Sequence, residues 1–213
     1  MLTTQISPTM PTQTTEEKIL ASAEREFILK GFDAARTTSI AKDAGVTHAM
    51  LHYYFRSKEN LFEKVISEKM SALGELMLNS LVASDRPLFE NISEAITWHL
   101  DFIGANPHLP QFFIREVYSH PERMELLAQT IRTNAQISIT KLQQQIDEAA
   151  SRGECRLINA EMLLLDIVSL DIFSFLARPV VEQLMPELFA DREKFLEERK
   201  KENIETIMRK IKI

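Results

Sequence analysis

Cysteine is nearly absent from the sequence, since Cys155 is the only one among 213 residues. No internal disulfide can form, and a reducing cytoplasm is the expected location. No apolar run reaches the roughly 18 residues needed to span a bilayer, so we expect no membrane segment. The start, MLTTQISPTMPTQTT, has neither a cationic region nor an apolar one. We therefore expect a disordered arm over residues 1–13 and no secretory signal.

Glycine and proline are also scarce, with five and eight residues. Gly31, Gly45, Gly104 and Gly153 each follow an apolar stretch with helical spacing, where a left-handed cap needs no side chain. The sequence shows no sustained alternation of apolar and polar residues, and no Asn-Gly or Asp-Gly hairpin signal. These patterns predict an all-α fold of about nine helices.

The helical pattern changes around 67–86, near the segment ASDRP, so we expect two domains, 14–66 and 67–213. In the second, residues 160–177 are apolar nearly all round, which is typical of a helix buried on several sides. The last segment, 191–212, is highly charged but keeps apolar residues at helical spacing. It predicts one amphipathic helix.

The net charge of −6 argues against a general nucleic-acid binder, but the charge is unevenly distributed. Within residues 36–58 the only acidic residue is Asp43, set against Arg36, Lys42, Arg56 and Lys58. A small cationic patch is therefore expected on an otherwise acidic molecule.

Two short helices are predicted within this patch, about 37–44 and 48–54, and Gly45 separates them. This arrangement is typical of a helix-turn-helix, whose second helix enters the major groove of DNA. Ala41, Val46 and Leu51 are the small or apolar residues that can pack the two helices inward. The outward face of the second helix then carries Thr47, His48, Ala49 and His52. Histidines can hydrogen-bond base edges, and a small alanine can touch a thymine methyl group.

Other residues suit contacts with the phosphate backbone. Thr37 and Thr38 offer hydroxyls and free amides where the first short helix begins. Tyr53, Tyr54 and Lys58 lie at the far end of the second. Two structural alternatives stay open, because Tyr54 can pack between helices and Lys58 can cap one, whereas Phe55 is expected in the core.

Three stretches, ILASAEREFILKGF, TTSIAKDAGVT and LHYYFRSKENLF, occur in the order and spacing of a known pattern. Over residues 14–66 the sequence resembles the DNA-binding domain of the TetR-type transcriptional regulators. The resemblance implies base reading by His48, Ala49 and His52. It implies phosphate contacts by Thr37, Thr38, Thr47, Tyr53, Tyr54 and Lys58. The sequence departs from the usual string at His52, where the family has tyrosine, and at Met50, where it has threonine or serine.

The same resemblance implies that residues 67–213 form a helical domain for effector binding and dimerisation. Helices 160–177 and 191–212 are the expected dimer helices, although the first can instead be the central helix of a monomer's core. Candidate residues for an effector pocket are Trp98, His99, Phe102, Phe112, Phe113, Tyr118 and Met124. Each of them can equally be a core residue, and His99 on an apolar stripe needs a polar partner. His99, His108, Glu116 and His120 match no dedicated metal motif, so we expect neither a metal nor a cofactor.

The leading hypothesis is a ligand-responsive repressor that binds a palindromic operator in double-stranded DNA as a homodimer. A small-molecule effector would then release it. An activator or a ligand-independent DNA binder of the same fold is the alternative. An enzyme with an accessory helix-turn-helix is disfavoured because the sequence has no Gly-rich phosphate loop and no nucleophile elbow.

Overall fold

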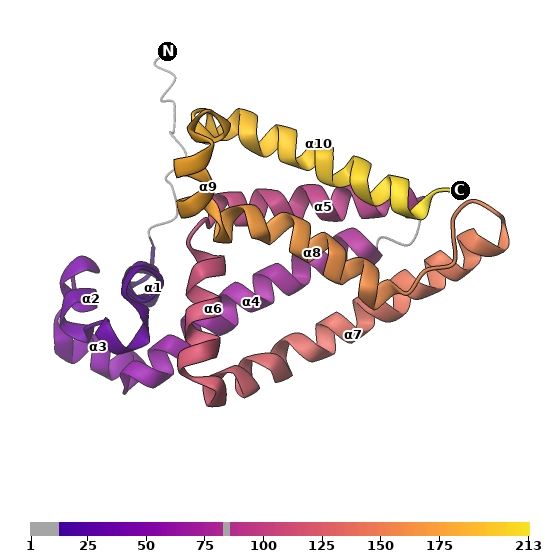
Figure 1. Cartoon of the computed structure of the whole chain (residues 1–213). Helices are drawn as coiled ribbons and strands as arrows, with labels where there is room; N and C mark the ends of the chain where they lie inside the picture. The colour runs from indigo at the N-terminus through magenta and orange to yellow at the C-terminus, as the bar shows by residue number, and fades with distance from the viewer. Residues whose placement is uncertain (1–12, 83–85) are drawn as a thin grey trace, which may run out of the picture. The chain divides into compact units, whose positions relative to one another are not determined.

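The computed structural model describes residues 13–82 and 86–213, apart from the side chains of 70, 73–82, 117, 121–131, 133 and 134. Within these ranges the chain forms ten α-helices, one short 3-10 helix and no strand (Figure 1). The all-α prediction is confirmed, and nearly all of the predicted arm lies outside the described residues. The helices are α1 (Thr15–Ala34), α2 (Thr37–Asp43), α3 (His48–Phe55), α4 (Lys58–Val82), α5 (Leu88–Ala105), α6 (Leu109–Ser119), α7 (Pro121–Ser151), α8 (Ala160–Leu176), α9 (Arg178–Leu184), η1 (Pro186–Phe189) and α10 (Arg192–Ile211).

One helix more than expected is present, because α9 follows α8 almost directly. Pro179 lies in its first turn, where a missing amide hydrogen costs nothing.

The cap predicted at Gly104 is wrong, since α5 continues to Ala105. A Cβ at Gly104 would lie 3.0 Å from a methyl carbon of Leu196, so this glycine instead lets α10 approach α5 closely.

The chain divides into two compact units after Val65, and the residues of α4 belong partly to each. In the N-terminal unit, α1 begins with a capping box in which Thr14 accepts from the Glu17 amide and Glu17 accepts from the Thr14 amide. Three phenylalanine rings, Phe27, Phe32 and Phe62, meet in its core at centroid separations between 5.0 and 6.1 Å. These contacts join α1 to the first turns of α4.

The core of the C-terminal unit is built around α5, which packs on α7, α8 and α10 (Figure 1). Ile92, Ile96 and Leu100 recur at a four-residue spacing along α5 and are all fully buried. A long apolar face of this kind supplies most of a helix's stability through packing rather than through intrinsic propensity.

A buried polar triad also links three of these helices. His99 Nδ1 of α5 lies 2.7 Å from Asp171 Oδ2 of α8, and Asn203 Nδ2 of α10 donates to Asp171 Oδ1 at 2.7 Å. All three residues are buried, with exposures of 4%, 0% and 2%. His99 therefore has the polar partner that its buried position requires.

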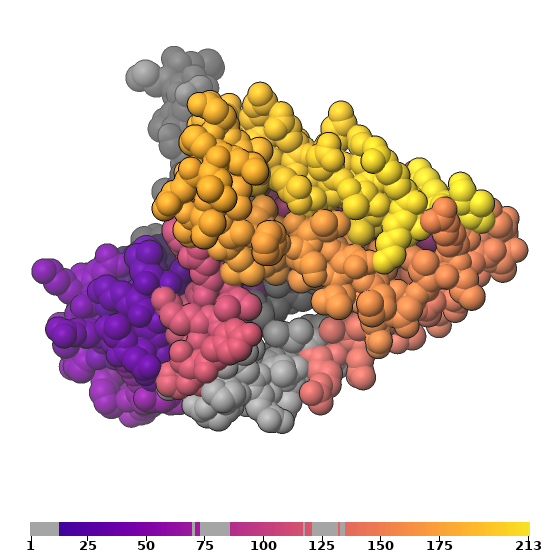
Figure 2. Space-filling model, in the orientation of Figure 1, coloured from indigo at the N-terminus to yellow at the C-terminus, as the bar shows by residue number. Residues whose placement is uncertain are grey.

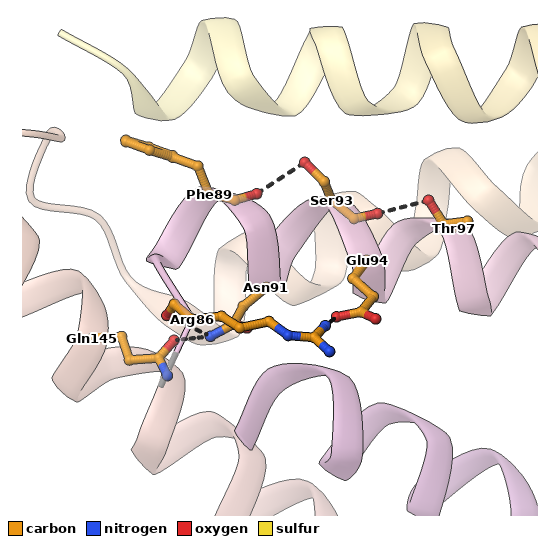
Figure 3. A network of polar contacts seen from close by, with 7 residues as sticks. All are labelled: Arg86, Phe89, Asn91, Ser93, Glu94, Thr97 and Gln145. Atoms are coloured by element: carbon orange, nitrogen blue, oxygen red, sulfur yellow. Dashed lines mark hydrogen bonds and ion pairs between the residues drawn. The ribbon is translucent and has the colours of Figure 1, made fainter. Parts of the chain in front are cut away.

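A second polar network secures the start of α5 (Figure 3). Asn91 is fully buried and donates to the Arg86 carbonyl at 3.3 Å and to Gln145 Oε1 of α7 at 3.4 Å. Arg86 also pairs with Glu94. Since a buried amide without partners costs about 1–3 kcal/mol, these bonds favour one register of α5 on α7.

One face of α8 is apolar and yet exposed. Ala160, Leu163 and Ile167 are buried on its inner side. Met162, Leu165 and Phe173 lie on the opposite side, with exposures of 55%, 57% and 67%. Figure 2 shows the surfaces of α8, α9 and α10 beside one another. The helix is therefore not buried on all sides within one chain, although its residues are apolar nearly all round.

Candidate nucleic-acid interface

Helix α3 is held by a cap and by two buried side chains. Thr47 Oγ1 accepts the Met50 amide hydrogen at 3.2 Å, which satisfies a donor that the first turn leaves free. Leu51 and Phe55, one turn apart, are 3% and 7% exposed. Because these two residues fix the inner side of α3, its other side faces solvent.

That outer side carries the predicted base-reading residues. His48, Ala49 and His52 are all exposed, and the two imidazole rings lie 6.5 Å apart between centroids. Thr37 Oγ1 of α2 lies 3.0 Å from His48 Nε2, so the hydroxyl positions one ring nitrogen and leaves Nδ1 without that constraint. Base edges require donors and acceptors at fixed positions, and this bond limits the freedom of the His48 ring.

The predicted phosphate-binding residues surround this face. Thr38, Thr47, Tyr53 and Tyr54 are exposed, and Thr37 is half-buried. Tyr53 is 72% exposed and Tyr54 is 42% exposed, so neither hydroxyl-bearing ring is a core side chain. Phe55 is buried, as expected. Most of these residues are therefore accessible on α2, on α3 and at the N-cap of α3.

Lys58 already has structural partners. Its Nζ donates to the Asp33 carbonyl at 3.2 Å and lies 4.5 Å from the centroid of the Phe32 ring. The capping role that the sequence left open is thus present, because the ammonium group neutralises carbonyl charge at the end of α1. A phosphate contact by Lys58 would have to share this ammonium group.

Arg25 neutralises the negative charge of Asp43, the acidic residue within 36–58. Arg25 Nη2 donates to Asp43 Oδ2 at 2.6 Å. This bond, with a smaller contribution from the Ser22 hydroxyl, holds the pKa of the Asp43 carboxyl below its ordinary value, against an opposing effect of desolvation. Arg25 thereby cancels the negative charge of Asp43, and the cations of residues 36–58 keep their excess.

The six of the seven predicted effector residues whose side chains are described differ widely in exposure. Trp98 and Tyr118 are exposed, at 48% and 83%, and Phe112 is buried at 1%. Phe102 and Phe113 are half-buried, His99 belongs to the polar triad, and the side chain of Met124 lies outside the described part. Their role in effector binding stays a prediction.

A cavity of about 670 Å³ lies elsewhere in the C-terminal unit, between α6, α8, α9, η1 and α10. None of the seven residues lines it. Its wall includes Phe173, Ser174, Phe189 and Arg199. These residues come from three separate elements, α8, η1 and α10, without a shared sequence motif, so no periodic signal could have identified them.

Among the described residues, no group of three or more histidine, cysteine, aspartate or glutamate side chains is placed to hold a metal ion. In the same part of the chain, no helix combines the length and the hydropathy that crossing a membrane requires.

A protein-family model matches most of the N-terminal unit. Residues 19–65 match the family model described as bacterial regulatory proteins, tetR family. This range contains all of α2 and α3, and therefore the exposed face described above.

Curated relatives match over part of their length. The protein called "Probable HTH-type transcriptional regulator YttP", from Bacillus subtilis (strain 168), is 42% identical over 104 residues, which are 48% of this chain and 50% of that protein. The HTH-type transcriptional repressor BepR of Brucella suis biovar 1 (strain 1330) is 33% identical over 66 residues, 31% of this chain and 32% of that protein. The chain thus spans half or less of the length of the curated relatives it matches.

Solved structures match nearly the whole chain. The TetR family transcriptional regulator PfmR from Thermus thermophilus superposes with a TM-score of 0.67 at 18% identity, covering 93% of this chain and 97% of that chain. HlyIIR, a hemolysin II transcriptional regulator, gives a TM-score of 0.59 at 24% identity over 86% of this chain and 95% of that one. At these identities the likeness establishes the fold.

Proposed function

We propose, for a chain that belongs to the tetR family of bacterial regulatory proteins, that it is a repressor acting in the cytoplasm as a homodimer on a palindromic operator. A small-molecule effector releases it from that operator. Residues 14–66 form the DNA-binding domain, and residues 67–213 form the domain for effector binding and dimerisation. The relative BepR carries the name of a repressor, which supports this sign of control.

The observation that carries the proposal is the exposed face of α3. Two buried side chains and the Thr47 cap fix this helix, while His48, Ala49 and His52 face solvent. Such a short helix, with small and hydrogen-bonding residues outward, suits insertion of its N-terminal end into the major groove. His48 and His52 read base edges, and Ala49 contacts a thymine methyl group.

Phosphate contacts position the helix on the duplex. Thr37, Thr38, Thr47, Tyr53, Tyr54 and Lys58 supply them through hydroxyl, amide and ammonium groups. The compensation of Asp43 by Arg25 supports this role, because an unpaired carboxylate beside phosphates would repel them. Attraction by the remaining cations is expected to weaken as salt concentration rises.

Dimerisation through α8 is supported by its exposed apolar face. Met162, Leu165 and Phe173 on one helix face are more than half exposed, and a second copy can cover them in a twofold interface. In such a dimer the two α3 helices lie ~34–36 Å apart, one turn of B-DNA, and read a palindrome. The exposed positions of α10 are largely charged, so α10 contributes polar rather than apolar contacts.

Effector binding acts through a shift between two conformations of the dimer. Helix α4 contains residues of both units, so a movement of α4 in the C-terminal unit changes the separation of the two α3 helices. The effector binds more tightly to the conformation in which the helices no longer match the operator.

The experiment that tests this function is a gel-shift titration with DNA from upstream of the chain's own gene. We expect a complex that competitor DNA of unrelated sequence does not displace. Its affinity should fall by about 10³–10⁵ between about 50 and 200 mM salt, as the release of counterions from roughly 6–10 contacted phosphates implies. Sedimentation in parallel establishes that the protein is dimeric. A dimer that binds all DNA sequences equally would contradict the proposal.

A further inference from the structure

The cavity of the C-terminal unit combines an apolar wall with one cation. Of its fourteen lining residues, eleven are apolar, two are serines, and Arg199 is the only charged one. We propose that this cavity binds an apolar molecule that carries one carboxylate, which Arg199 and Ser174 hold. The inference rests on the proposed function and deepens it by naming the chemical class and the site of the effector.

Arg199 lacks the negative partner that such a position requires. Its Nη2 donates to the Leu170 carbonyl at 3.2 Å, but it forms no ion pair with a described carboxylate. Its Nε is shielded from solvent and has no hydrogen-bond partner within the described residues. Four residues away on α10, Phe195 and Asn203 carry no carboxylate, and Glu202, three residues away, is exposed and forms no ion pair with Arg199.

Two other arginines of the C-terminal unit each form an ion pair with a glutamate on the same helix. Arg178 pairs with Glu182 at 3.2 Å, and Arg209 pairs with Glu205 at 3.2 Å, each four residues away. A half-buried guanidinium without such a partner is costly, because the low dielectric around it offers little compensation for lost water. A carboxylate of a bound molecule would supply that compensation with the planar geometry that guanidinium favours.

Ser174 provides a second polar group in the same wall. Its hydroxyl is shielded from solvent and, in the described part of the chain, has no hydrogen-bond partner. A buried hydroxyl is ordinarily bonded, so this one is available to donate to an acidic ligand. The two unsatisfied groups come from α8 and α10, and both residues line the one cavity.

The remaining wall defines the rest of the ligand. Aromatic and aliphatic side chains from several elements, among them Phe173, Phe189 and Phe195, leave no described carboxylate to attract a basic molecule. The volume of about 670 Å³ lies within the range of about 300–1,000 Å³ typical of small-molecule sites. An acid with an apolar body of about a dozen carbons therefore fits better than a base or a polar metabolite.

Isothermal titration calorimetry of the full-length protein tests this assignment with dodecanoate and with 1-dodecanol, both below their aggregation limits. The two probes share an apolar chain and differ in charge. We expect the unchanged protein to bind dodecanoate at least about tenfold more tightly than the alcohol, as one charge-assisted hydrogen bond implies. Equal affinity for acid and alcohol would overturn the proposal, and this comparison needs no variant.

Substitutions then locate the anion. Arg199→Gln is expected to weaken dodecanoate binding by about ten- to a hundredfold, and Arg199→Lys should restore part of it. Arg209→Gln, on the exposed side of the same helix, should leave binding unchanged. If Arg199→Gln folds and binds dodecanoate normally, Arg199 does not hold the anion and the inference fails. The inference also fails if the variant loses dodecanoate binding only because it no longer self-associates, since the cavity then receives a second copy of the chain.

The DNA-binding proposal can fail separately. Sequence-specific DNA binding without any dodecanoate binding would overturn the ligand assignment alone. Tight binding of dodecanoate that depends on Arg199, together with no specific DNA complex, would support the site while removing the proposed function.

Discussion

Asp171 shows how much a single buried carboxylate can organise. Its two oxygens are engaged by side chains from two other helices, His99 of α5 and Asn203 of α10, each at 2.7 Å. A group of this kind contributes to a unique arrangement of helices when all its hydrogen bonds are made, and it destabilises the fold when one partner is removed. We therefore expect the triad to be sensitive to substitution.

We predict that Asp171→Ala lowers the free energy of unfolding of the C-terminal unit by about 3–5 kcal/mol, because two buried donors lose their acceptor. Asp166→Ala is the matched control on the same helix, since Asp166 pairs with Lys210 at the surface and such pairs contribute about 0–1 kcal/mol. Urea titrations followed by fluorescence of Trp98, the single tryptophan, measure both. Equal losses in the two variants would contradict the prediction.

At the DNA surface, His52→Ala is expected to reduce discrimination between the operator and unrelated DNA by about 1–3 kcal/mol, the usual contribution of a base contact. Lys42→Ala removes an exposed cation of α2 and should weaken binding to both DNAs alike. Competition gel shifts at one salt concentration compare the ratios of the two affinities. An unchanged ratio for His52→Ala would show that this histidine does not read bases.

At the scale of helices, the geometry of α2 and α3 depends on their connection. Gly45 adopts a φ of 68°, and a Cβ added there would meet no atom within 4 Å. The amide of Val46 bonds to the Ala41 carbonyl at 3.0 Å, which closes the turn. The glycine is therefore required by backbone conformation alone, since left-handed backbone is costly for most side chains.

This requirement gives a graded prediction. Gly45→Ala should destabilise the N-terminal unit by about 1–2 kcal/mol. Gly45→Asn should cost less, because asparagine visits the left-handed region more readily. Hydrogen exchange of the α2 and α3 amides measures the local stability in both variants. If alanine and asparagine have equal effects, strain at φ is not the cause.

Local chemistry explains why parts of these helices could be predicted from sequence. The left-handed cap predicted at Gly45 depends on neighbouring residues alone, and the structure confirms it. The capping box at Thr14 and the cap at Thr47 are local features of the same kind. The partners Thr37 and His48 come from different helices, 11 residues apart, and no pattern predicts their bond.

Long-range partners could not be predicted for a related reason. The sequence indicates that His99 needs a polar partner, but Asp171 lies 72 residues further along the chain. The cavity joins five separate elements, so its wall depends on how the helices pack rather than on any one stretch. Aromatic residues clustered in sequence, such as Phe112 and Phe113, favour a pocket prediction, and neither of these two residues lines the cavity.

The region between α7 and α8 yields a prediction about pH. Cys155 is 3% exposed, and burial, together with the charge of Glu154, raises the pKa of its thiol above an ordinary value of 9.0. The folded state thus keeps its thiol proton at pH values where the unfolded chain has lost it. The stabilisation that the protonated thiol contributes is fully present below the ordinary thiol pKa, and it is lost as pH rises through the pKa of Cys155 in the folded state.

Comparing the native chain with Cys155→Ala isolates that effect. At about pH 8 the substitution lowers the free energy of unfolding, because it leaves a small cavity. The difference in the free energy of unfolding between the two proteins should narrow by roughly 1 kcal/mol by about pH 10, because only the native chain has a thiol to ionise. Urea titrations at both pH values measure it. A difference that stays constant or widens would mean that the thiol does not contribute to alkaline destabilisation.

On the scale of the whole molecule, charge and apolar surface are divided between different regions. The chain carries a net charge of −6, yet residues 36–58 have four cations and one carboxylate. The exposed apolar side chains of α8 lie in the other compact unit. Attraction to DNA and self-association therefore depend on separate surfaces, which separate substitutions can address.

We predict that Leu165→Glu converts the protein to a monomer, because a charge placed in an apolar interface must be desolvated without a partner. Lys201→Glu, at an exposed position of α10, should leave the protein dimeric. Sedimentation equilibrium distinguishes the two species. A dimeric Leu165→Glu protein with native helix content would show that α8 is not at the interface.

Phe173 takes part in two of the surfaces described above, since it lines the cavity and is also 67% exposed on the outer side of α8. A molecule in the cavity and a second copy on α8 would then touch the same ring. Because the two binding equilibria are linked, the factor by which the ligand changes the affinity between the two copies equals the factor by which dimerisation changes the affinity for the ligand. The midpoint of a ligand titration would accordingly drift with protein concentration, and the direction of that drift would reveal whether the two occupants cooperate or compete.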